Sequence, residues 1–407
     1  MNQSALDAVA AWVTKAGLVG CGESQLVAGF CSRIVASGVP LARAMIILDT
    51  LHPIYEGRVF RWRADQPEIA EALDYGRTNQ GEALENWRRS PFFHLLETGE
   101  AMLRRHFAAG DPADFAAVAQ ARDEGVTDYL AMVQRFADEG VIGDMDCVYS
   151  SWATEAPGGF TDTEVTAIGR LAPFLKLAVK SAALARMAGT LAQTYLGRDP
   201  ARHVMSGRIA RGVTEKINAI LWYSDLHGYT RIADTSPPEQ IIPLLNDYAD
   251  VVVSAVHEHG GDVLKLVGDG ILAIFTGEDR RRAGLEALAA ATQVRQSAEE
   301  LSRRRGSENL PISDVYLALH LGDVFYGNVG SKDRLDFTVI GPAVNEVSRI
   351  LAMSRSVERD VLLSARFVQA LDADTRRRVV SVGRFALRGV ADPQELFTPE
   401  PGFGVSR

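Results

Sequence analysis

The chain has 407 residues, of which 47% are hydrophobic and 23% charged, as in ordinary soluble globular proteins. This length predicts two or three domains. The net charge of -9 and the pI near 5.5 argue against a general nucleic-acid binder. Arginine triplets occur at 280–282, 303–305 and 376–378, but each adjoins acidic residues or an expected helix end, which favours solvated helix termini.

Two features of the sequence concern the cellular compartment. The three cysteines, Cys21, Cys31 and Cys147, are odd in number and lack metal-ligand spacing, so we expect reduced thiols in a cytoplasmic protein. The N-terminus lacks the pattern of a signal peptide, and charged residues interrupt the longest apolar stretch, 171–196. We therefore expect no membrane-spanning segment and no membrane partner.

The first half of the chain predicts helices followed by strands. The expected helices are Leu6–Thr14 and Gln25–Ala36, and the expected strands are Ala44–Leu48 and Arg58–Trp62. Two further strand-like runs, at 129–136 and 145–152, are joined by the acidic, glycine-containing segment 137–144, which predicts an antiparallel hairpin.

A long helix is expected after this hairpin. Thr161 is its expected N-cap, and Glu164 is the capping-box partner three residues later. The order of elements, closed by GGFTDTEVTAIGRLAPFLKLAV, resembles the end of a GAF-type sensory domain. Over residues 1–160 the resemblance implies a ligand pocket or a dimerisation platform for an unknown small-molecule or protein signal. His52 and His106 are isolated and stay unassigned as ligands.

Residues 161–212 are expected to form a helical linker. Four apolar residues follow a near-heptad stripe there: Leu177, Leu184, Met187 and Leu191. The stripe is compatible both with a short coiled coil and with a helix packed on its own domain. Gly197 and Pro200 then break the helical pattern, so 196–212 is the expected connection to the next domain.

The second half, residues 213–400, alternates strands and helices before a short tail, 401–407. The expected order is a strand ending at Asp225, a helix at 238–257, a hairpin of 263–266 and 271–275, a helix to 305, strands at 315–320, 324–328 and near 339, and a helix at 343–353. This order predicts an α+β fold with a ferredoxin-like split βαβ arrangement. It places Asp269 at a hairpin tip close to the end of the first strand.

Asp225 and Asp269 each follow an apolar, strand-like run. An Asp beside Gly is usually a turn residue. Because two strands of one sheet can deliver both carboxylates side by side, the pair is also a candidate metal site. Mg²⁺ favours such a site, with one or two carboxylates completed by substrate phosphates.

Four motifs, SDLHGYT, KLVGDG, GDVFYGNVG and FTVIGPAVNEVSRI, stand in this order between residues 218 and 398. With their spacing they resemble a class III nucleotidyl cyclase catalytic domain. The resemblance implies that Asp225 and Asp269 bind two divalent ions, Mg²⁺ or Mn²⁺, with the Leu226 carbonyl as a further ligand. It also implies that backbone N–H groups cradle the β- and γ-phosphates at a helix start. The cradle residues are Leu226, His227, Gly228, Tyr229 and Thr230, where His227 and Tyr229 replace the commoner Arg and Phe.

Lys265 lies four residues before Asp269 and therefore on the same strand face. A lone Lys in an apolar strand is usually solvent-facing. The resemblance instead matches Lys265 to the donor that contacts the purine ring and Thr338 to its partner. A lysine donor and a hydroxyl acceptor suit adenine, whose N1 accepts and whose amine donates. Guanylate-selective relatives carry an acid at the first position.

Asn345 and Arg349 are four residues apart and share a helix face. On its own this spacing is typical of a polar surface stripe. The resemblance matches Asn345 to the residue that orients the ribose and Arg349 to the one that stabilises charge on the α-phosphate, a role that suits a planar, permanent cation. Arg388 stands where many relatives have a Lys that contacts the terminal phosphates.

These matches imply an adenylate cyclase. In that reaction the 3′-oxygen of ATP attacks its own α-phosphate, with two metal ions as Lewis acids, and releases pyrophosphate and 3′,5′-cyclic AMP. The family pattern places the metal aspartates and the other site residues on different chains, so a homodimer with two composite sites is implied. A guanylate or relaxed-specificity cyclase and a non-catalytic nucleotide-binding regulator are the two alternatives.

Overall fold

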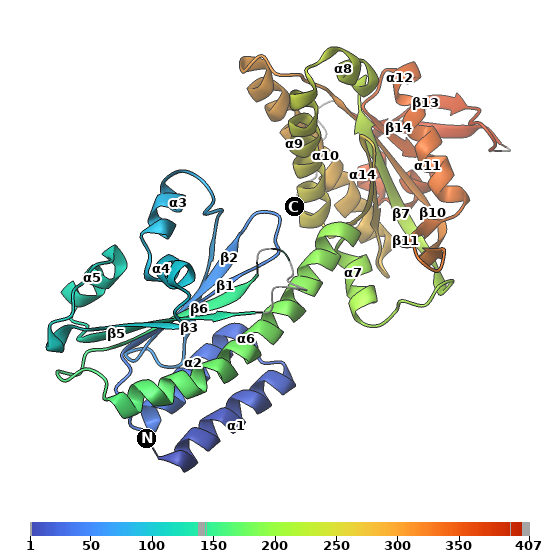
Figure 1. Cartoon of the computed structure of the whole chain (residues 1–407). Coiled ribbons are helices and arrows are strands. Elements are labelled where there is room, and N and C mark those ends of the chain that lie inside the picture. Colours follow the sequence, from blue (N-terminus) through green and yellow to red (C-terminus); the bar gives the residue numbers. More distant parts are fainter. Residues whose placement is uncertain (1, 137–142, 144, 391, 401–407) are drawn as a thin grey trace. The chain divides into compact units, whose positions relative to one another are not determined.

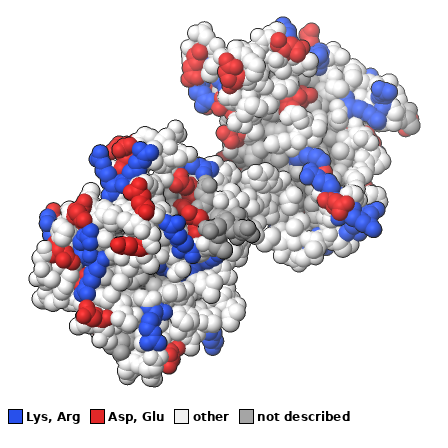
Figure 2. Space-filling model, in the orientation of Figure 1, with Lys and Arg blue, Asp and Glu red and all other residues white. Residues whose placement is uncertain are grey.

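The computed structural model describes residues 2–136, 143, 145–390 and 392–400. The chain forms two compact units, Met1–Leu191 and Ala192–Arg407, and each is described by itself (Figure 1). The predicted hairpin connection at 137–144, except for Gly143, and the tail 401–407 lie outside the described residues. The expected boundaries at 160, 212 and 400 stay predictions. On the face shown in Figure 2, acidic and basic side chains are interspersed.

The N-terminal unit contains one six-stranded antiparallel sheet with the strand order β3-β2-β1-β6-β5-β4. Its strands are β1 Arg43–Asp49, β2 Gly57–Arg63, β3 Ala70–Tyr75, β4 Met102–His106, β5 Asp128–Arg135 and β6 Cys147–Thr154. Its helices are α1 Gln3–Val19, α2 Glu23–Ala36, α3 Gly81–Arg88, α4 Pro91–Thr98, α5 Ala116–Asp123 and α6 Asp162–Leu196. The predicted pairing of β5 with β6 is confirmed, whereas β3, α3, α4, β4 and α5 gave no usable sequence pattern.

Helices cover both faces of this sheet. The apolar faces of α1, α2 and α6 pack on one side, and α4 and α5 pack on the other. Of the predicted α6 stripe, Met187 is buried and Leu184 packs against the same core, while Leu177 is 68% exposed. The interpretation of a helix packed on its own domain therefore holds for Leu184 and Met187. The GAF resemblance stays a prediction.

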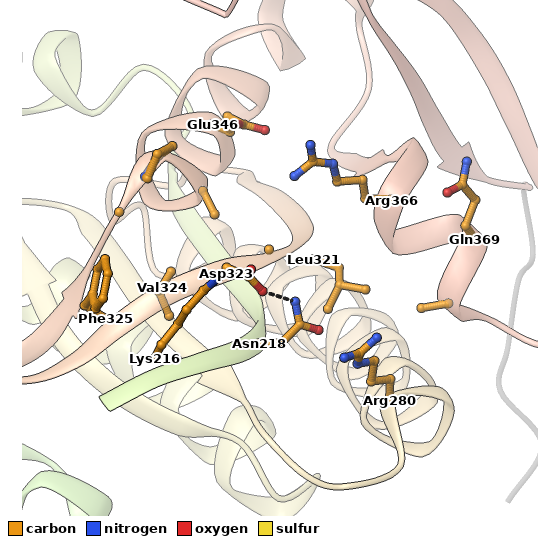
Figure 3. A pocket seen from close by; sticks show the side chains of 15 residues that line it. Lys216, Asn218, Arg280, Leu321, Asp323, Val324, Phe325, Glu346, Arg366 and Gln369 are labelled. Carbon is orange, nitrogen blue, oxygen red and sulfur yellow. Dashed lines mark hydrogen bonds and ion pairs between the residues drawn. The ribbon is translucent and has the colours of Figure 1, made fainter. Parts of the chain in front are cut away.

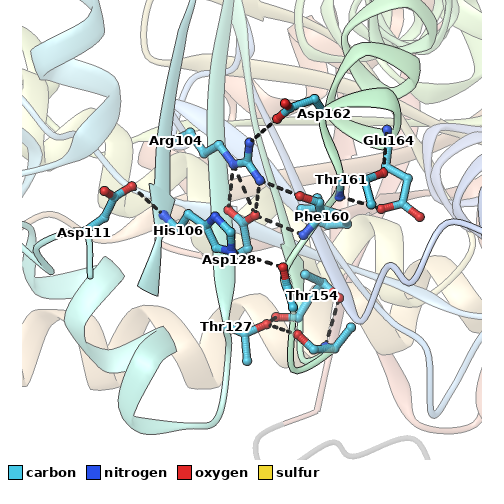
Figure 4. A network of polar contacts seen from close by, with 12 residues as sticks. Arg104, His106, Asp111, Thr127, Asp128, Thr154, Phe160, Thr161, Asp162 and Glu164 are labelled. Carbon is cyan, nitrogen blue, oxygen red and sulfur yellow. Dashed lines mark hydrogen bonds and ion pairs between the residues drawn. The ribbon is translucent and has the colours of Figure 1, made fainter. Parts of the chain in front are cut away.

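A polar network ties the start of α6 to the sheet (Figure 4). Asp128 of β5 is fully buried and accepts hydrogen bonds from the Arg104 guanidinium at 2.8 Å and from the Phe160 N–H at 3.0 Å. The predicted capping box is confirmed, because Thr161 N–H donates to Glu164 Oε2 at 2.7 Å and Glu164 N–H donates to Thr161 Oγ1 at 3.3 Å. The sheet and the capped helix start therefore share one set of hydrogen bonds.

We expect Asp128→Asn to lower the free energy of unfolding by about 2–3 kcal/mol, because it leaves Arg104 facing a neutral buried partner. Urea unfolding of the full chain measures this loss. Asp162→Asn is the matched control, since Asp162 contacts the same Arg104 at 3.1 Å but its side chain is 100% exposed. An exposed pair contributes little, so equal losses in the two variants would contradict the assignment.

The C-terminal unit contains an eight-stranded sheet with the strand order β13-β14-β12-β10-β7-β9-β8, and β11 also pairs with β10. Its strands are β7 Thr214–Leu226, β8 Asp262–Val267, β9 Gly270–Phe275, β10 Val315–Gly330, β11 Leu335–Ile340, β12 Val361–Ser364, β13 Val379–Phe385 and β14 Gln394–Pro399. Its helices are α7 Arg198–Met205, α8 Tyr229–Thr235, α9 Pro238–Glu258, α10 Arg280–Ser307, α11 Pro342–Ala352, α12 Ser354–Val357, α13 Ala365–Ala370 and α14 Ala373–Arg376.

The order β10-β7-β9-β8 is the ferredoxin-like split βαβ arrangement that the sequence predicted. Helices α9 and α10 pack on one face of this sheet and α11 packs on the other. Each of these neighbouring strand pairs is antiparallel. β9 lies between β7 and β8 and runs antiparallel to both. The ends of β7 and of the β8–β9 hairpin therefore meet at one edge.

One sequence prediction in this unit was wrong. The strands expected at 315–320 and 324–328 are one continuous strand, β10, because Gly322 and Asp323 keep the pairing with Ala219 and Asn218 of β7. Gly322 serves close packing, since a Cβ at this position would lie 2.4 Å from the Ala343 Cβ of α11. The connection expected at 196–212 contains α7, and its role as a linker stays a prediction.

Two smaller findings concern the remaining sequence predictions. Cys31 and Cys147 are buried free thiols and Cys21 is a partly buried free thiol, and burial raises the pKa of Cys31 well above its ordinary value. Within the described residues, every helix is too short or too polar to cross a membrane.

Candidate active site

Asp225 and Asp269 lie side by side at the edge where β7 ends. Asp225 is the next-to-last residue of β7, and Asp269 occupies the turn between β8 and β9. Pairing of Ser224 with Ile271 brings the two segments into register. The Leu226 N–H donates to Asp269 Oδ2 at 3.3 Å, which holds the turn carboxylate against the end of β7.

The floor beneath Asp225 is buried and polar. Ser224 is fully buried, and its Oγ accepts a hydrogen bond from Trp222 Nε1 at 3.1 Å. The same Oγ lies 2.9 Å from the Tyr248 hydroxyl of α9. These contacts fix the strand end that carries Asp225, so the carboxylate stands on a rigid base.

The two carboxylates repel each other. Burial, and secondarily the charge of Asp269, raise the pKa of Asp225 from 3.8 to about 6, against a smaller opposing effect of Arg355. A divalent cation between them would remove this repulsion, so the pair fits a metal ion. Among the described residues, clusters of three or more His, Cys, Asp or Glu suited to a metal are absent. Two carboxylates match the ligand number that Mg²⁺ takes when substrate phosphates complete its shell.

The raised pKa of Asp225 predicts how stability depends on pH without metal. Its carboxylate is less stable in the folded chain than in the unfolded one, so its contribution is full below pH 3.8 and is lost as pH rises through about 6. In EDTA at pH 7.5 we expect Asp225→Asn to raise Tm by about 2–4 °C, and this gain should vanish near pH 4. Calorimetry with excess Mn²⁺ provides the control, because the ion should stabilise only the wild type. A gain that is independent of pH would contradict this account.

The predicted phosphate cradle lies between the end of β7 and the start of α8. Gly228 has φ of 71° and leads directly into α8, so Tyr229 and Thr230 stand at a helix start as expected. However, the Leu226 N–H donates to Asp269, and the His227 N–H donates to the Asp314 carbonyl at 2.9 Å. Two of the five expected N–H donors are therefore engaged within the chain, which leaves those of Gly228, Tyr229 and Thr230.

The His227 side chain lies against a neighbouring ring. Its imidazole stands 4.7 Å from the Tyr316 ring of β10 at an interplanar angle of 33°. His227, which replaces the commoner Arg, therefore packs on the protein surface next to β7. This contact gives His227 a structural partner in Tyr316.

Lys265 of β8 forms an ion pair with Asp336 of β11. Asp336 precedes Thr338 by two residues on the same strand, so both side chains lie on one face of β11. Lys265 is exposed, and Thr338 and Asp336 are partly exposed. The ion pair thus brings Lys265 close to the strand that carries Thr338 and adds a carboxylate that the sequence prediction missed. The spacing of two residues between Asp336 and Thr338 was the signal in the sequence that could have identified Asp336.

Asn345 and Arg349 share the outer face of α11, opposite the buried Val347 and Ile350. Arg349 also lies next to the loop that follows β13. A Cβ at Gly389 would stand 3.4 Å from the Arg349 guanidinium, so this glycine leaves room for the cation. Gly389 has φ of 70° and directly follows the exposed Arg388. The structure therefore brings Arg388 and Arg349 to one neighbourhood.

The site residues form two groups within one chain. Asp225 and Asp269 are the expected metal-binding group, and Lys265, Thr338, Asn345, Arg349 and Arg388 are the group expected to contact the nucleotide. In the described part of the chain, no hydrogen bond or ion pair joins the first group to Lys265, Asn345 or Arg349.

Comparisons with known proteins bear on the C-terminal unit. Residues 213–398 match the family model described as the adenylate and guanylate cyclase catalytic domain. An adenylate cyclase from Anabaena cylindrica is 33% identical over 149 residues, which cover 37% of this chain and 30% of that protein. An uncharacterised protein from Mycobacterium tuberculosis is 33% identical over 207 residues, which cover 50% of this chain and 36% of that protein. The matched segment therefore spans about a third of the length of these curated relatives.

Solved structures of cyclases are also similar to this chain. The adenylyl cyclase CyaB from P. aeruginosa is 21% identical, with a TM-score of 0.43, over 47% of this chain and 97% of that chain. The guanylyl cyclase Cya2 is 24% identical, with a TM-score of 0.40, over 45% of this chain and 92% of that chain.

Proposed function

Because residues 213–398 form an adenylate and guanylate cyclase catalytic domain, we propose that this chain converts ATP to 3′,5′-cyclic AMP and pyrophosphate under control of its N-terminal unit. The observation that carries the proposal is the adjoining Asp225 and Asp269 carboxylates at the end of β7. The exposed Asn345 and the partly exposed Arg349 on one face of α11 support it. Nucleotide cyclisation needs an anionic metal site and a cation for the α-phosphate, and the two aspartates and Arg349 would supply them.

Each of the proposed site residues has a separate role in the reaction. Two divalent ions bound by Asp225, Asp269 and the Leu226 carbonyl would supply Lewis-acid chemistry at the 3′-hydroxyl and the polyphosphate. The 3′-oxygen forms a bond to the α-phosphorus as the bond to the bridging oxygen breaks, and its proton goes to solvent. Arg349 stabilises the charge that develops on the α-phosphate, and Asn345 orients the ribose.

The remaining groups recognise the ends of the substrate. Arg388 lies beside Arg349 through Gly389 and contacts the terminal phosphates. The backbone N–H groups of Gly228, Tyr229 and Thr230 assist at the β- and γ-phosphates. Lys265 donates to adenine N1, and the Thr338 hydroxyl accepts from the exocyclic amine.

The two groups of site residues complete each other only across two copies of the chain. This inference follows the family pattern, which places the two groups on different chains, and it makes the active enzyme a homodimer with two equivalent sites. An isolated chain then has no complete site.

A relaxed-specificity or guanylate cyclase is the second candidate, and Thr338 favours it because a hydroxyl can both donate and accept. Purified full chain incubated with ATP or GTP and Mn²⁺ distinguishes the two when both cyclic nucleotides are measured. We expect cyclic AMP to predominate. Equal turnover of the two substrates supports the second candidate, and no cyclic nucleotide from either would leave a non-catalytic nucleotide-binding role.

We expect Lys265→Glu to lower cyclic AMP formation by roughly 10²-fold and to raise the ratio of cyclic GMP to cyclic AMP, because the acid accepts where guanine donates. The substitution also places two carboxylates, at 265 and Asp336, in contact. Lys332→Glu is the control, since Lys332 is exposed and lies in the β10–β11 turn. An unchanged product ratio would show that Lys265 does not read the base.

A further inference from the structure

A cavity of about 770 Å³, apart from the candidate active site, lies in the C-terminal unit where β7 begins (Figure 3). Its wall comes from the start of β7, the middle of β10, the start of α11 and the helices α10 and α13. None of the residues assigned to nucleotide cyclisation lines it. The volume is within the range of small-molecule sites, which is roughly 300–1,000 Å³.

Two arginines of this wall have no partner of their own. Lys216 forms an ion pair with Asp323 at 2.8 Å, and Asn218 donates to the same carboxylate at 2.7 Å. Arg280 and Arg366, by contrast, make no hydrogen bond or ion pair within the described residues, although Arg282 on the same helix pairs with Glu286. Figure 3 shows Arg280 of α10 and Arg366 of α13 on the side of the cavity away from Lys216.

A polar pair lies where β10 meets α11. His320 of β10 is 1% exposed, and its Nε2 lies 3.3 Å from Glu346 Oε2 of α11, which lines the cavity. Burial, with a smaller effect of Arg366, lowers the pKa of His320 to about 4, so the ring is neutral at pH 7. Glu346 therefore faces a neutral ring at the cavity wall.

Several buried polar atoms of this region lack a hydrogen bond. Within the described residues these include both ring nitrogens of His320 and the Oδ1 of Asn218. Native proteins leave few buried polar atoms unpaired, and such atoms commonly mark a position that an unseen polar group completes. Two unpaired arginines, the Glu346 carboxylate and the unpaired Asn218 Oδ1 all line one cavity, and the buried His320 contacts Glu346.

We propose that this cavity binds a small phosphate monoester that carries hydroxyl groups, at a site separate from the nucleotide-cyclising one. Arg280 and Arg366 hold the phosphate, since planar guanidinium groups pair with phosphate oxygens through two parallel hydrogen bonds. Glu346 accepts from a hydroxyl of the same ligand, and the Gln369 amide, on the same helix as Arg366, adds a donor. The phosphate neutralises the arginines that the chain itself leaves unpaired.

Isothermal titration of the full chain with ribose 5-phosphate and with inorganic phosphate tests this site. EDTA is present throughout, so metal-dependent binding at Asp225 and Asp269 does not contribute. Arg280→Ala/Arg366→Ala should weaken both ligands by about tenfold or more, whereas Glu346→Gln should weaken ribose 5-phosphate alone. Arg281→Ala is the matched control, because Arg281 neighbours Arg280 on α10 but does not line the cavity.

The outcomes separate this site from the proposed active site. Arg349→Ala should leave ribose 5-phosphate binding unchanged, and the result does not depend on whether the chain makes cyclic nucleotides. Binding that is unaffected by the double substitution, binding that Arg349→Ala abolishes, or no binding of either ligand at millimolar concentration would each overturn the proposal. Circular dichroism confirms that the variants remain folded.

Discussion

Asp269→Asn should lower cyclic AMP formation by roughly a thousandfold at saturating ATP and Mn²⁺. The substitution preserves shape and can still accept a hydrogen bond from Leu226, but it removes one of the two charges that bind the cations. Because the amide is a poor ligand for a hard divalent ion, the loss should be largest at low Mn²⁺ and should shrink as the metal concentration rises.

Glu278→Gln makes the same chemical change at an exposed position between β9 and α10 and should leave activity unchanged. Circular dichroism and thermal unfolding show whether the variant is folded. A folded Asp269→Asn protein with near wild-type activity at low Mn²⁺ would mean that the carboxylate pair is not the metal site.

Arg349→Ala should lower kcat by roughly 10²- to 10³-fold with little change in KM, because its cation acts on charge that develops during transfer. Arg349→Lys keeps the charge but loses the planar fork, so it should recover only part of the rate. Arg303→Ala, at an exposed position near the end of α10, is the control. A variant that raises KM and spares kcat would instead assign Arg349 to substrate binding alone.

The sequence predicted the strand and helix order of the C-terminal unit well because its elements carry strong periodicity. Asp225 and Asp269 could be placed together, since the split βαβ order delivers both to one sheet edge. The continuity of β10 could not be predicted, because Gly322 and Asp323 resemble a turn until pairing with β7 is known. In the N-terminal unit, β3 alternates poorly because most of its side chains are exposed.

Contacts between distant residues were harder to predict than the elements. Lys265 was expected beside Thr338, but the contact with Asp336 depends on how β11 pairs with β10. The His227 N–H was expected to be free, yet the position of Asp314 after α10 supplies it with an acceptor. The cavity where β7 begins draws on residues from five separate segments, and no local pattern connects Arg280, Glu346 and Arg366.

The central claim is that each active site combines the aspartates of one chain with Arg349 of another. Mixing Asp269→Asn with Arg349→Ala, each nearly inactive alone, tests it directly. Random pairing makes half of the dimers mixed, each with one intact site of two, so cyclic AMP formation should return to roughly a quarter of the wild-type rate. If the mixture is no more active than the two separate variants, the composite site is wrong.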